Sequence, residues 1–517
     1  MHHSAHAFAA GIAVAVTLGS LGISATAAPM INEIMYRPGT GYPENTALEY
    51  IEIFNPESTA VDLSGWALTS GVNYTFPAGS TIGAGGFVVV AANPTALAAA
   101  FPGVTALGPW QAGASLSNKG EKIALSQPGT DPGTFTKVSE VTYATEGDWA
   151  QRVRETTWNG WDWSTPANGG GKSLELRNPA LSNDNGQNWT ASTAASGGTP
   201  GAANSVLTNN LPPIIHDVKH SPAIPRSTDS VTISCEVNDE AAAAARTATL
   251  FYRNATASSP PAFSSTPMVN DGAGKFTAVL LPAADKTIWE FYISSTDGTG
   301  TRTWPDTTPL GQLANCQYQV DDEVSSLTAD TYRLVLTTAE NNAFNNVSSS
   351  SNRQFNMTLV TARGAETSVR YRSSMRIRGN SSRSYTFRPL RISIPGDNPL
   401  DGFVDFNLNP RSPHMQYLGM RLFAAAGLPA PDALPVELRR NGVESTTSSG
   451  STPDYGRWVR VEDFSATTVD RHWPNANTGG IYKKGRPDEF WRNTTAAPAN
   501  PDTLLDGWTK ENNSSAN

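Results

Sequence analysis

The stretch EYIEIFNP (residues 49–56) alternates charged or polar and apolar side chains before it reaches an Asn-Pro pair. A second stretch, GGFVVVAANP (residues 85–94), is continuously apolar between a Gly-Gly pair and another Asn-Pro pair. Alternation predicts a strand with one buried face, and the apolar run predicts a strand that is buried on both faces. Because Asn-Pro and Gly-Gly mark turns, these stretches indicate short antiparallel strands of an immunoglobulin-type sandwich.

The composition of the whole chain agrees with a turn-rich, mainly β protein of several domains. The chain has 517 residues, including 44 Gly and 36 Pro, and a formal net charge of −9. This length suggests three or four domains. A protein that binds nucleic acid usually carries the opposite charge, so no nucleic-acid partner is expected.

The N-terminus predicts export. An apolar stretch runs from Ala7 to Ile23 and is followed by Ala25-Thr26-Ala27, a small-x-small cleavage signal. The stretch suits a cleaved signal peptide over residues 1–27 better than a membrane anchor. The mature chain is therefore expected in the secreted or cell-envelope compartment, without a transmembrane segment.

A second β module is predicted over residues 214–322, after a linker at residues 205–213 that is rich in Asn, Pro and small polar residues. Alternating runs such as SVTISCEV (residues 230–237) and IWEFYI (residues 288–293) predict its strands, and Asp-Gly pairs mark tight turns. The pattern is that of an immunoglobulin-like or fibronectin type III spacer.

Two features leave alternatives open. Cys235 and Cys316 are the only cysteines, and in an exported protein they either form one disulfide or remain two buried thiols. Four tryptophans crowd one stretch and either stack on a sugar ring or fill and support the sandwich core. These are Trp149, Trp158, Trp161 and Trp163.

Arginine is concentrated in the last part of the chain. Between Arg353 and Arg391 there are nine arginines, no lysine and one acid, Glu366. In an uninterrupted strand, Arg370, Arg372, Arg376 and Arg378 would project from one face. Either this is a solvated or ion-paired sheet face, or the guanidinium groups form a phosphate-binding surface.

The first segment, residues 28–204, resembles a lamin-tail domain of the bacterial secreted type. The similarity rests on INEIMYRP (residues 31–38), EYIEIFNP, VDLSGWAL (residues 61–68) and GGFVVVAANP, and on the closing GKSLELRNP (residues 171–179), NWTAST (residues 188–193) and GTPGAAN (residues 198–204). The resemblance implies an immunoglobulin-like fold and a binding or tethering role.

Residues 328–517 resemble the N-terminal part of the spore-coat CotH kinase family. The similar segments are MRIRGNSSRSY (residues 375–385), RPLRISI (residues 388–394), VELRRNG (residues 436–442), YGRWVRVEDFS (residues 455–465) and GGIYKKG (residues 479–485). The fold expected for the whole chain is therefore mainly β, with two immunoglobulin-like sandwiches followed by an incomplete α+β kinase-like lobe.

The CotH resemblance implies an atypical kinase that transfers the γ-phosphoryl group of ATP, with Mg²⁺ or Mn²⁺, to Ser or Thr of a secreted or envelope protein. It assigns phosphate contacts to Arg378, Arg383 and Arg391, the adenine hinge to Glu462 and a nucleotide contact to Lys483. No catalytic or metal-binding residue is assigned, because the corresponding acids are expected beyond Asn517.

Two departures speak against activity of this chain alone. Relatives have Lys where this chain has Ser393, and the catalytic half is expected outside the sequence, so whether the chain is an enzyme stays open. The alternative is a non-catalytic adhesion or scaffold protein whose modules bind proteins or a cell-surface polymer.

Overall fold

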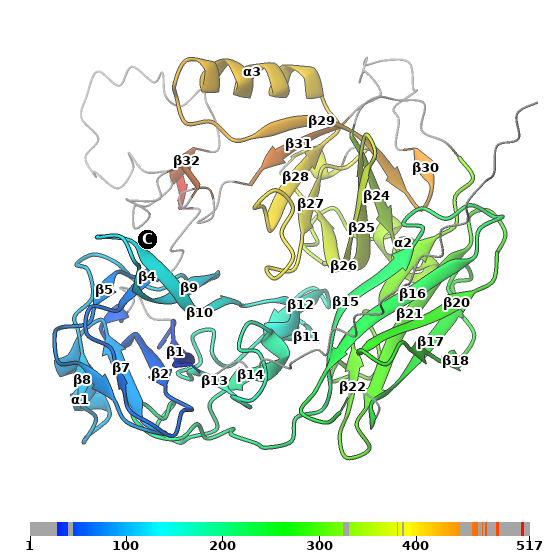
Figure 1. Cartoon of the computed structure of the whole chain (residues 1–517). Helices are drawn as coiled ribbons and strands as arrows, with labels where there is room; N and C mark the ends of the chain where they lie inside the picture. Colours follow the sequence, from blue (N-terminus) through cyan, green and yellow to red (C-terminus); the bar gives the residue numbers. More distant parts are fainter. Residues whose placement is uncertain are drawn as a thin grey trace, which may run out of the picture.

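The computed structural model describes residues 28–39, 45–242, 245–323, 330–379, 381–384, 387–444, 458–463, 468, 471–472, 482–484 and 508–510. The predicted signal peptide, residues 1–27, lies outside these ranges. The described residues form three β-rich modules (Figure 1). The prediction of a mainly β protein is confirmed.

The first module is a sandwich of two sheets, antiparallel except for the parallel pair of β7 and β8. The larger sheet has the order β14-β13-β1-β2-β7-β8, and the smaller has the order β10-β9-β4-β5. The larger sheet consists of β1 (Met30–Met35), β2 (Tyr50–Phe54), β7 (Phe87–Ala91), β8 (Ala106–Leu107), β13 (Leu174–Leu176) and β14 (Trp189–Ala191). The smaller consists of β4 (Ala67–Ser70), β5 (Tyr74–Thr75), β9 (Gly120–Pro128) and β10 (Phe135–Ala144). Two further strand pairs and one helix complete the module. The pairs are β3 (Val61–Asp62) with β6 (Thr81–Ile82) and β11 (Gln151–Arg154) with β12 (Trp161–Ser164), and the helix is α1 (Pro94–Ala100).

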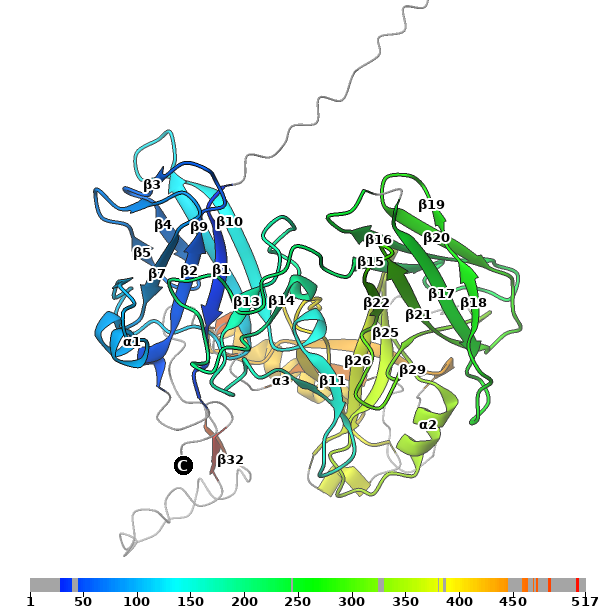
Figure 2. The same ribbon diagram turned by 90° about the horizontal axis from the view of Figure 1, so that it is seen from below.

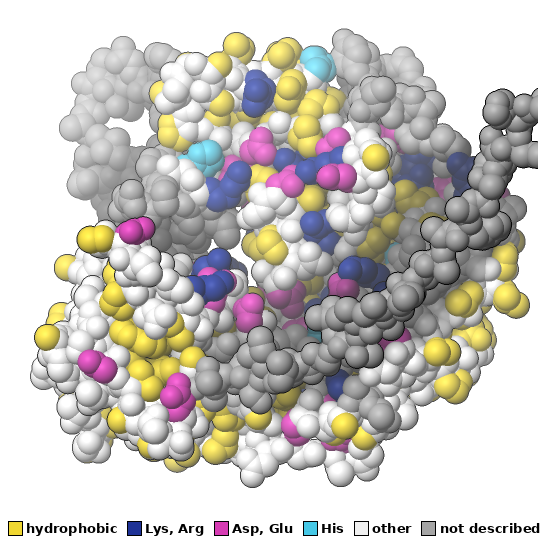
Figure 3. All heavy atoms as spheres, in the orientation of Figure 1, with side chains coloured by type: hydrophobic (Ala, Val, Ile, Leu, Met, Phe, Trp, Pro, Cys, Tyr) yellow, Lys and Arg dark blue, Asp and Glu magenta, His cyan; other side chains and the backbone are white. Residues whose placement is uncertain are grey.

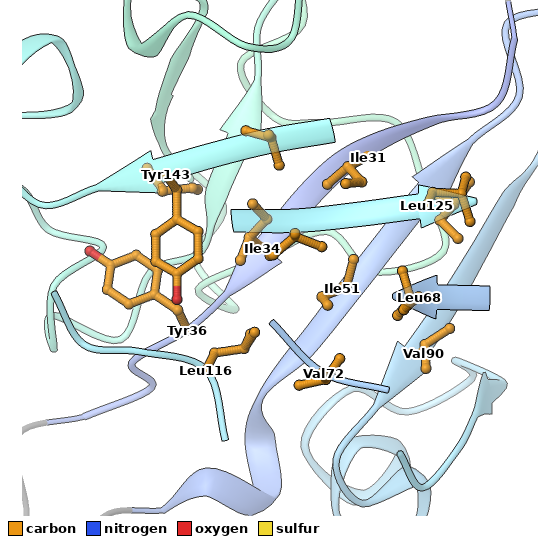
Figure 4. Packing of buried hydrophobic residues seen from close by; sticks show 14 of the residues in the cluster. Ile31, Ile34, Tyr36, Ile51, Leu68, Val72, Val90, Leu116, Leu125 and Tyr143 are labelled. Carbon is orange, nitrogen blue, oxygen red and sulfur yellow. The ribbon is translucent and has the colours of Figure 1, made fainter. Parts of the chain in front are cut away.

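The core of this module lies between the two sheets. Figure 4 shows Ile34 and Ile51 of the larger sheet facing Leu125 of the smaller one, and all three are fully buried. The alternation of residues 49–56 predicts a charged, solvated second face, and here the prediction is wrong. Glu52, on this second face, is 0% exposed. The reason is that other segments of the same module cover this face, and the chain that follows β14 contributes the Gly201 amide as a donor to Glu52.

The second module is also a two-sheet sandwich. One sheet has the order β15-β16-β20-β19; the other has the order β18-β17-β21-β22, with β23 also pairing β21. The strands are β15 (Ile214–Ser221), β16 (Val231–Asn238), β17 (Thr247–Asn254), β18 (Ser264–Pro267), β19 (Val269–Asn270), β20 (Lys275–Leu280), β21 (Ile288–Thr296), β22 (Thr301–Trp304) and β23 (Cys316–Gln319). Cys235 lies in one sheet and Cys316 in the other, and both are buried free thiols. Of the two alternatives for the cysteines, the structure has the buried thiols.

The third module is a closed barrel. Its sheet has the order β24-β25-β26-β27-β28-β31-β29-β30, and it closes because β24 also pairs with β29 in parallel. The strands are β24 (Asp330–Val335), β25 (Phe355–Arg363), β26 (Glu366–Ile377), β27 (Leu390–Ser393), β28 (Asp405–Asn409), β29 (Ala433–Arg440), β30 (Val443–Glu444) and β31 (Trp458–Glu462). Helix α2 (Thr338–Asn345) follows β24, and helix α3 (Pro413–Ala425) packs on β29 and β31. Outside the barrel, β32 (Tyr482–Lys484) pairs with β33 (Trp508–Lys510).

The three modules meet at Asp148 of the first module. Its carboxylate accepts hydrogen bonds from Arg372 of β26 at 2.6 Å and from the indole of Trp304 of β22 at 3.1 Å. The backbone amide of Asp148 donates to Asp397 of the barrel. Figures 1 and 2 show β11 on the side of the first module that faces the other two modules. The predicted spacer is thus packed against both of its neighbours.

Candidate functional site

The arginine-rich region does not form a single face. At Arg372 the backbone has φ of +56°, and the register of β26 against β25 shifts nearby. Arg370 therefore pairs with Leu359, whose side chain belongs to the barrel core, whereas Arg376 pairs with Arg391. Cross-strand partners share a face, so this bulge separates Arg370 from Arg376. The expectation of a shared face is wrong because the strand is interrupted.

Arg391 stands at the centre of the candidate site, on the outer face of β27. It contacts Asp405 of β28 at 3.0 Å and Asp463, which follows β31, at 2.8 Å. Burial opposes ionisation of Asp405, but Arg391 and a hydrogen bond from Ser393 hold the pKa of this carboxyl below its ordinary value. Ser393 stands at the position where the CotH resemblance predicts lysine. Its hydroxyl donates to Asp405 and so helps to hold the carboxylate that pairs with Arg391.

Arg376 and Arg383 are held differently, by neutral groups. Both donate to the side-chain oxygen of Asn352, and Arg383 also donates to the carbonyl of Ser351. Burial and the neighbouring charges of Arg391 and Arg383 lower the pKa of Arg376 to about 10. In the part of the chain that the structure describes, neither Arg376 nor Arg383 has an ion pair with a carboxylate. We call Arg376, Arg383 and Arg391 the arginine strip.

The other predicted site residues have contacts of their own. Arg378 donates to Asn409 at the end of β28. Glu462 is 3% exposed and accepts from Arg471 and the Asp432 amide. Lys483 lies in β32, opposite Thr509, and its side chain is outside the described part. The structure thus places Arg383 and Arg391 near Arg376, and the assignment of Arg378, Glu462 and Lys483 to a nucleotide stays a prediction.

Arg376 is the residue that the sequence interpretation did not assign. Its position directly opposite Arg391 depends on the register of β26 against β27, which spacing along the sequence does not give. Asn352, the acceptor shared by Arg376 and Arg383, gives no signal in the sequence at all.

The described residues contain no group of three or more His, Cys, Asp or Glu side chains able to hold a metal ion. Asp405 and Asp463, the acids nearest to the arginine strip, are already engaged by Arg391. Over the same ranges, no helix is long and apolar enough to cross a membrane.

The tryptophan-rich stretch forms a structural contact. Trp149 and Trp161 are buried, and the Trp161 indole donates to Glu340 of α2 at 3.0 Å. The guanidinium of Arg154 lies 3.7 Å from the centre of the Trp161 ring. Such stacking is a cation–π contact. Of the two alternatives, sugar stacking or support, the burial of Trp149 and Trp161 favours support, and Trp161 joins the first module to the barrel.

In a comparison with known protein families, residues 23–195 match the Lamin Tail Domain. The first module is a lamin tail domain. This agrees with the resemblance of the segments INEIMYRP and EYIEIFNP to that family. The family match covers about the first third of the chain. No curated protein matches the chain.

Among solved structures, the chain is similar at 10% identity to a mutant of Salmonella alpha-2-macroglobulin, with a TM-score of 0.14. The match covers 71% of this chain, and the chain spans only 28% of that protein's length. This similarity is too low to assign a fold. The lamin tail domain is thus the part of the chain with an assigned family.

Proposed function

We propose that the arginine strip binds the phosphate groups of a nucleoside triphosphate, as part of a CotH-like phosphotransferase. In the full parent, a Ser or Thr hydroxyl oxygen of a secreted or envelope protein would attack the γ-phosphorus. The bond to the bridging oxygen would break, ADP would leave, and the hydroxyl proton would pass to a base. The proposal assigns neither that base nor the ligands for Mg²⁺ or Mn²⁺ to a residue of this chain. The lamin tail domain and the second module would tether the exported protein.

The observation that carries the proposal is the excess of positive charge at the arginine strip, where only Arg391 is ion-paired among the described residues, with Asp405 and Asp463. Arg376 lies directly opposite Arg391, and like charges in this position destabilise a sheet. Arg376 and Arg383 have neutral acceptors only among the described residues, so a bound anion would relieve the repulsion. Planar guanidinium groups bind phosphate oxygens in pairs.

Binding of ATP to the chain tests this proposal. ATP with Mn²⁺ or Mg²⁺, and pyrophosphate alone, should raise the melting temperature, because a ligand of the native state stabilises it. Arg376→Gln and Arg383→Gln should each weaken binding by about tenfold or more, because a charge-assisted hydrogen bond contributes about 1.5–3 kcal/mol. Arg421→Gln removes one exposed charge from α3 and serves as the matched control.

No thermal shift at millimolar ATP or pyrophosphate would overturn the binding proposal. An equal loss in all three variants would reduce it to general electrostatic attraction. Phosphoryl transfer itself is measured on the full parent, as incorporation of labelled γ-phosphate into protein Ser or Thr.

A non-catalytic scaffold is the second candidate, and the contacts of Asp148 favour it. Arg372 is 9% exposed in its side chain and connects Asp148 to Asp397, while Trp304 adds the second module. A scaffold needs this fixed arrangement of modules, whereas a tether for a kinase does not. Arg372→Met should then increase the radius of gyration measured by small-angle X-ray scattering.

Helix α3 supports a further protein surface in either case. It exposes Met415 (64%), Leu418 (53%) and Leu422 (69%) along one side. Hydrophobic spheres gather over this part of the molecule in Figure 3. An exposed apolar face of this kind usually contacts another polypeptide. We propose that this polypeptide is a partner protein: a protein substrate of the phosphotransferase, or a bound protein of the scaffold.

A further inference from the structure

A cavity of about 180 Å³ lies between α2 and the barrel, away from the arginine strip. Its apolar walls come from four strands and the helix, and they are well buried. These walls are Leu334 of β24, Phe344 of α2, Leu390 of β27, Leu438 of β29 and Trp458 of β31. Figure 1 shows α2 beside the strands of the barrel.

Two guanidinium groups complete the lining of this cavity. Arg440, at the end of β29, donates to the side chain of Asn345 at 2.8 Å and lies 4.7 Å from the centre of the Phe344 ring. Arg388 donates to the carbonyl of Val347 at 3.0 Å. Both acceptors are neutral. Over the described ranges, neither arginine has an ion pair with a carboxylate.

The two arginines also repel each other. Burial and the charge of Arg388 lower the pKa of Arg440. Since an arginine stays charged in proteins, two positive charges line the otherwise largely apolar cavity. A carboxylate placed between them would accept hydrogen bonds from both, and the walls would cover an apolar group attached to it.

We propose that this cavity binds a small organic carboxylate, with its carboxylate between Arg388 and Arg440 and its apolar body against Leu334, Leu390 and Leu438. The cavity volume limits the size of the apolar part of the ligand, because an apolar cavity of about 150 Å³ accommodates a benzene ring. Benzoate and hexanoate have the matching size and charge. This site is separate from the arginine strip, and its proposal stands without the phosphotransferase.

Calorimetric titration of the whole chain with sodium benzoate tests the proposal, with three comparison ligands at equal ionic strength. Benzoate and hexanoate should bind. Benzyl alcohol, which has the same ring without the charge, and inorganic phosphate, which has the charge without the ring, should not compete with benzoate. Arg440→Gln and Arg388→Gln should each weaken benzoate binding by about tenfold or more. Arg421→Gln should leave it unchanged.

Four results would overturn the carboxylate site. The first is no heat of binding with benzoate or hexanoate at millimolar concentration, and the second is binding of benzyl alcohol as tight as that of benzoate. The third is full competition of inorganic phosphate with benzoate, and the fourth is a loss of benzoate affinity in Arg421→Gln equal to that in the other two variants. The comparison of benzoate with benzyl alcohol uses the unaltered chain, so it decides the matter even where an arginine variant fails to fold. ATP in the same cell separates this site from the arginine strip: benzoate affinity should not change when ATP is present.

Discussion

The lamin tail domain and the barrel each gather ionisable groups of one sign, but these groups have different partners. In the lamin tail domain the carboxylates accept hydrogen bonds from one covering segment, whereas in the barrel Arg391 is ion-paired and Arg376 and Arg383 donate to neutral oxygens. Glu33, Glu52 and Glu175 lie on three neighbouring strands, and all are 0% exposed. We call them the carboxylate cluster. The arginine strip is its counterpart of opposite sign, on β26, β27 and the turn between them.

The carboxylate cluster is closed by donors from the segment after β14. Thr199 donates from its amide to Glu33 and from its hydroxyl to Glu175, and the Gly201 amide donates to Glu52. Buried charges tolerate a low-dielectric site when such donors surround them. The arginine strip has no equivalent segment among the described residues. The difference is that the carboxylate cluster is closed by its own chain, whereas the arginine strip keeps an excess of positive charge, on which the proposal of an external anion rests.

The largest effect is expected from opening the carboxylate cluster at Gly198. A Cβ on this residue would lie 2.2 Å from the Tyr50 hydroxyl and 2.8 Å from Glu33 Oε1. Gly198→Ala should therefore lower the free energy of unfolding of the lamin tail domain by about 3 kcal/mol, because overpacking displaces the closing segment. Chemical denaturation measures this. Gly39→Ala, at a glycine with nothing within 4 Å, is the control. Equal stability of the two variants would show that this segment does not close the cluster.

A second effect, of about 3 kcal/mol at most, is expected from pH. Burial raises the pKa of Glu33 to about 7 despite hydrogen bonds from Ser173 and Tyr50. The folded state then binds this proton more tightly than the unfolded chain does, so stability rises as the pH falls through about 7 and levels off below the ordinary value of 4.5. Glu33→Gln, which carries no charge, should lack this part of the pH dependence.

The measurement is the difference in unfolding free energy between Glu33→Gln and the unaltered chain across this pH range. Glu33→Gln should be more stable than the unaltered chain by the largest amount at high pH. This difference in unfolding free energy should shrink as the pH falls, because Glu33 in the unaltered chain takes up a proton. A constant difference from pH 8 to pH 5 would contradict the assignment of the titration to Glu33.

The smallest effect concerns the arginine strip without ligand. Arg376→Gln removes one of two like charges on facing strands and should stabilise the barrel by about 0.5 kcal/mol. The same variant should bind pyrophosphate more weakly. Urea unfolding in low salt measures the stability, and Arg421→Gln should show no gain. A loss of stability in Arg376→Gln would mean that its bond to Asn352 outweighs the repulsion from Arg391.

The sequence by itself determined the lamin tail domain and the mainly β class. Runs such as residues 49–54 and 85–91 carry local periodicity and turn residues, and these depend only on neighbours in the chain. The composition also located the arginine-rich region, and with it two members of the arginine strip, Arg383 and Arg391.

Only the tertiary structure decided which charges are buried and which lie together. Glu52 alternates like a solvated residue and is buried because Gly201, far along the chain, covers it. Arg376 joins Arg391 because of a strand register, and Arg370 leaves them because of a bulge at Arg372. Periodicity specifies which residues alternate along one strand, but it contains no information about the partner strand or the segment that covers a face. That information comes from contacts between residues distant in sequence.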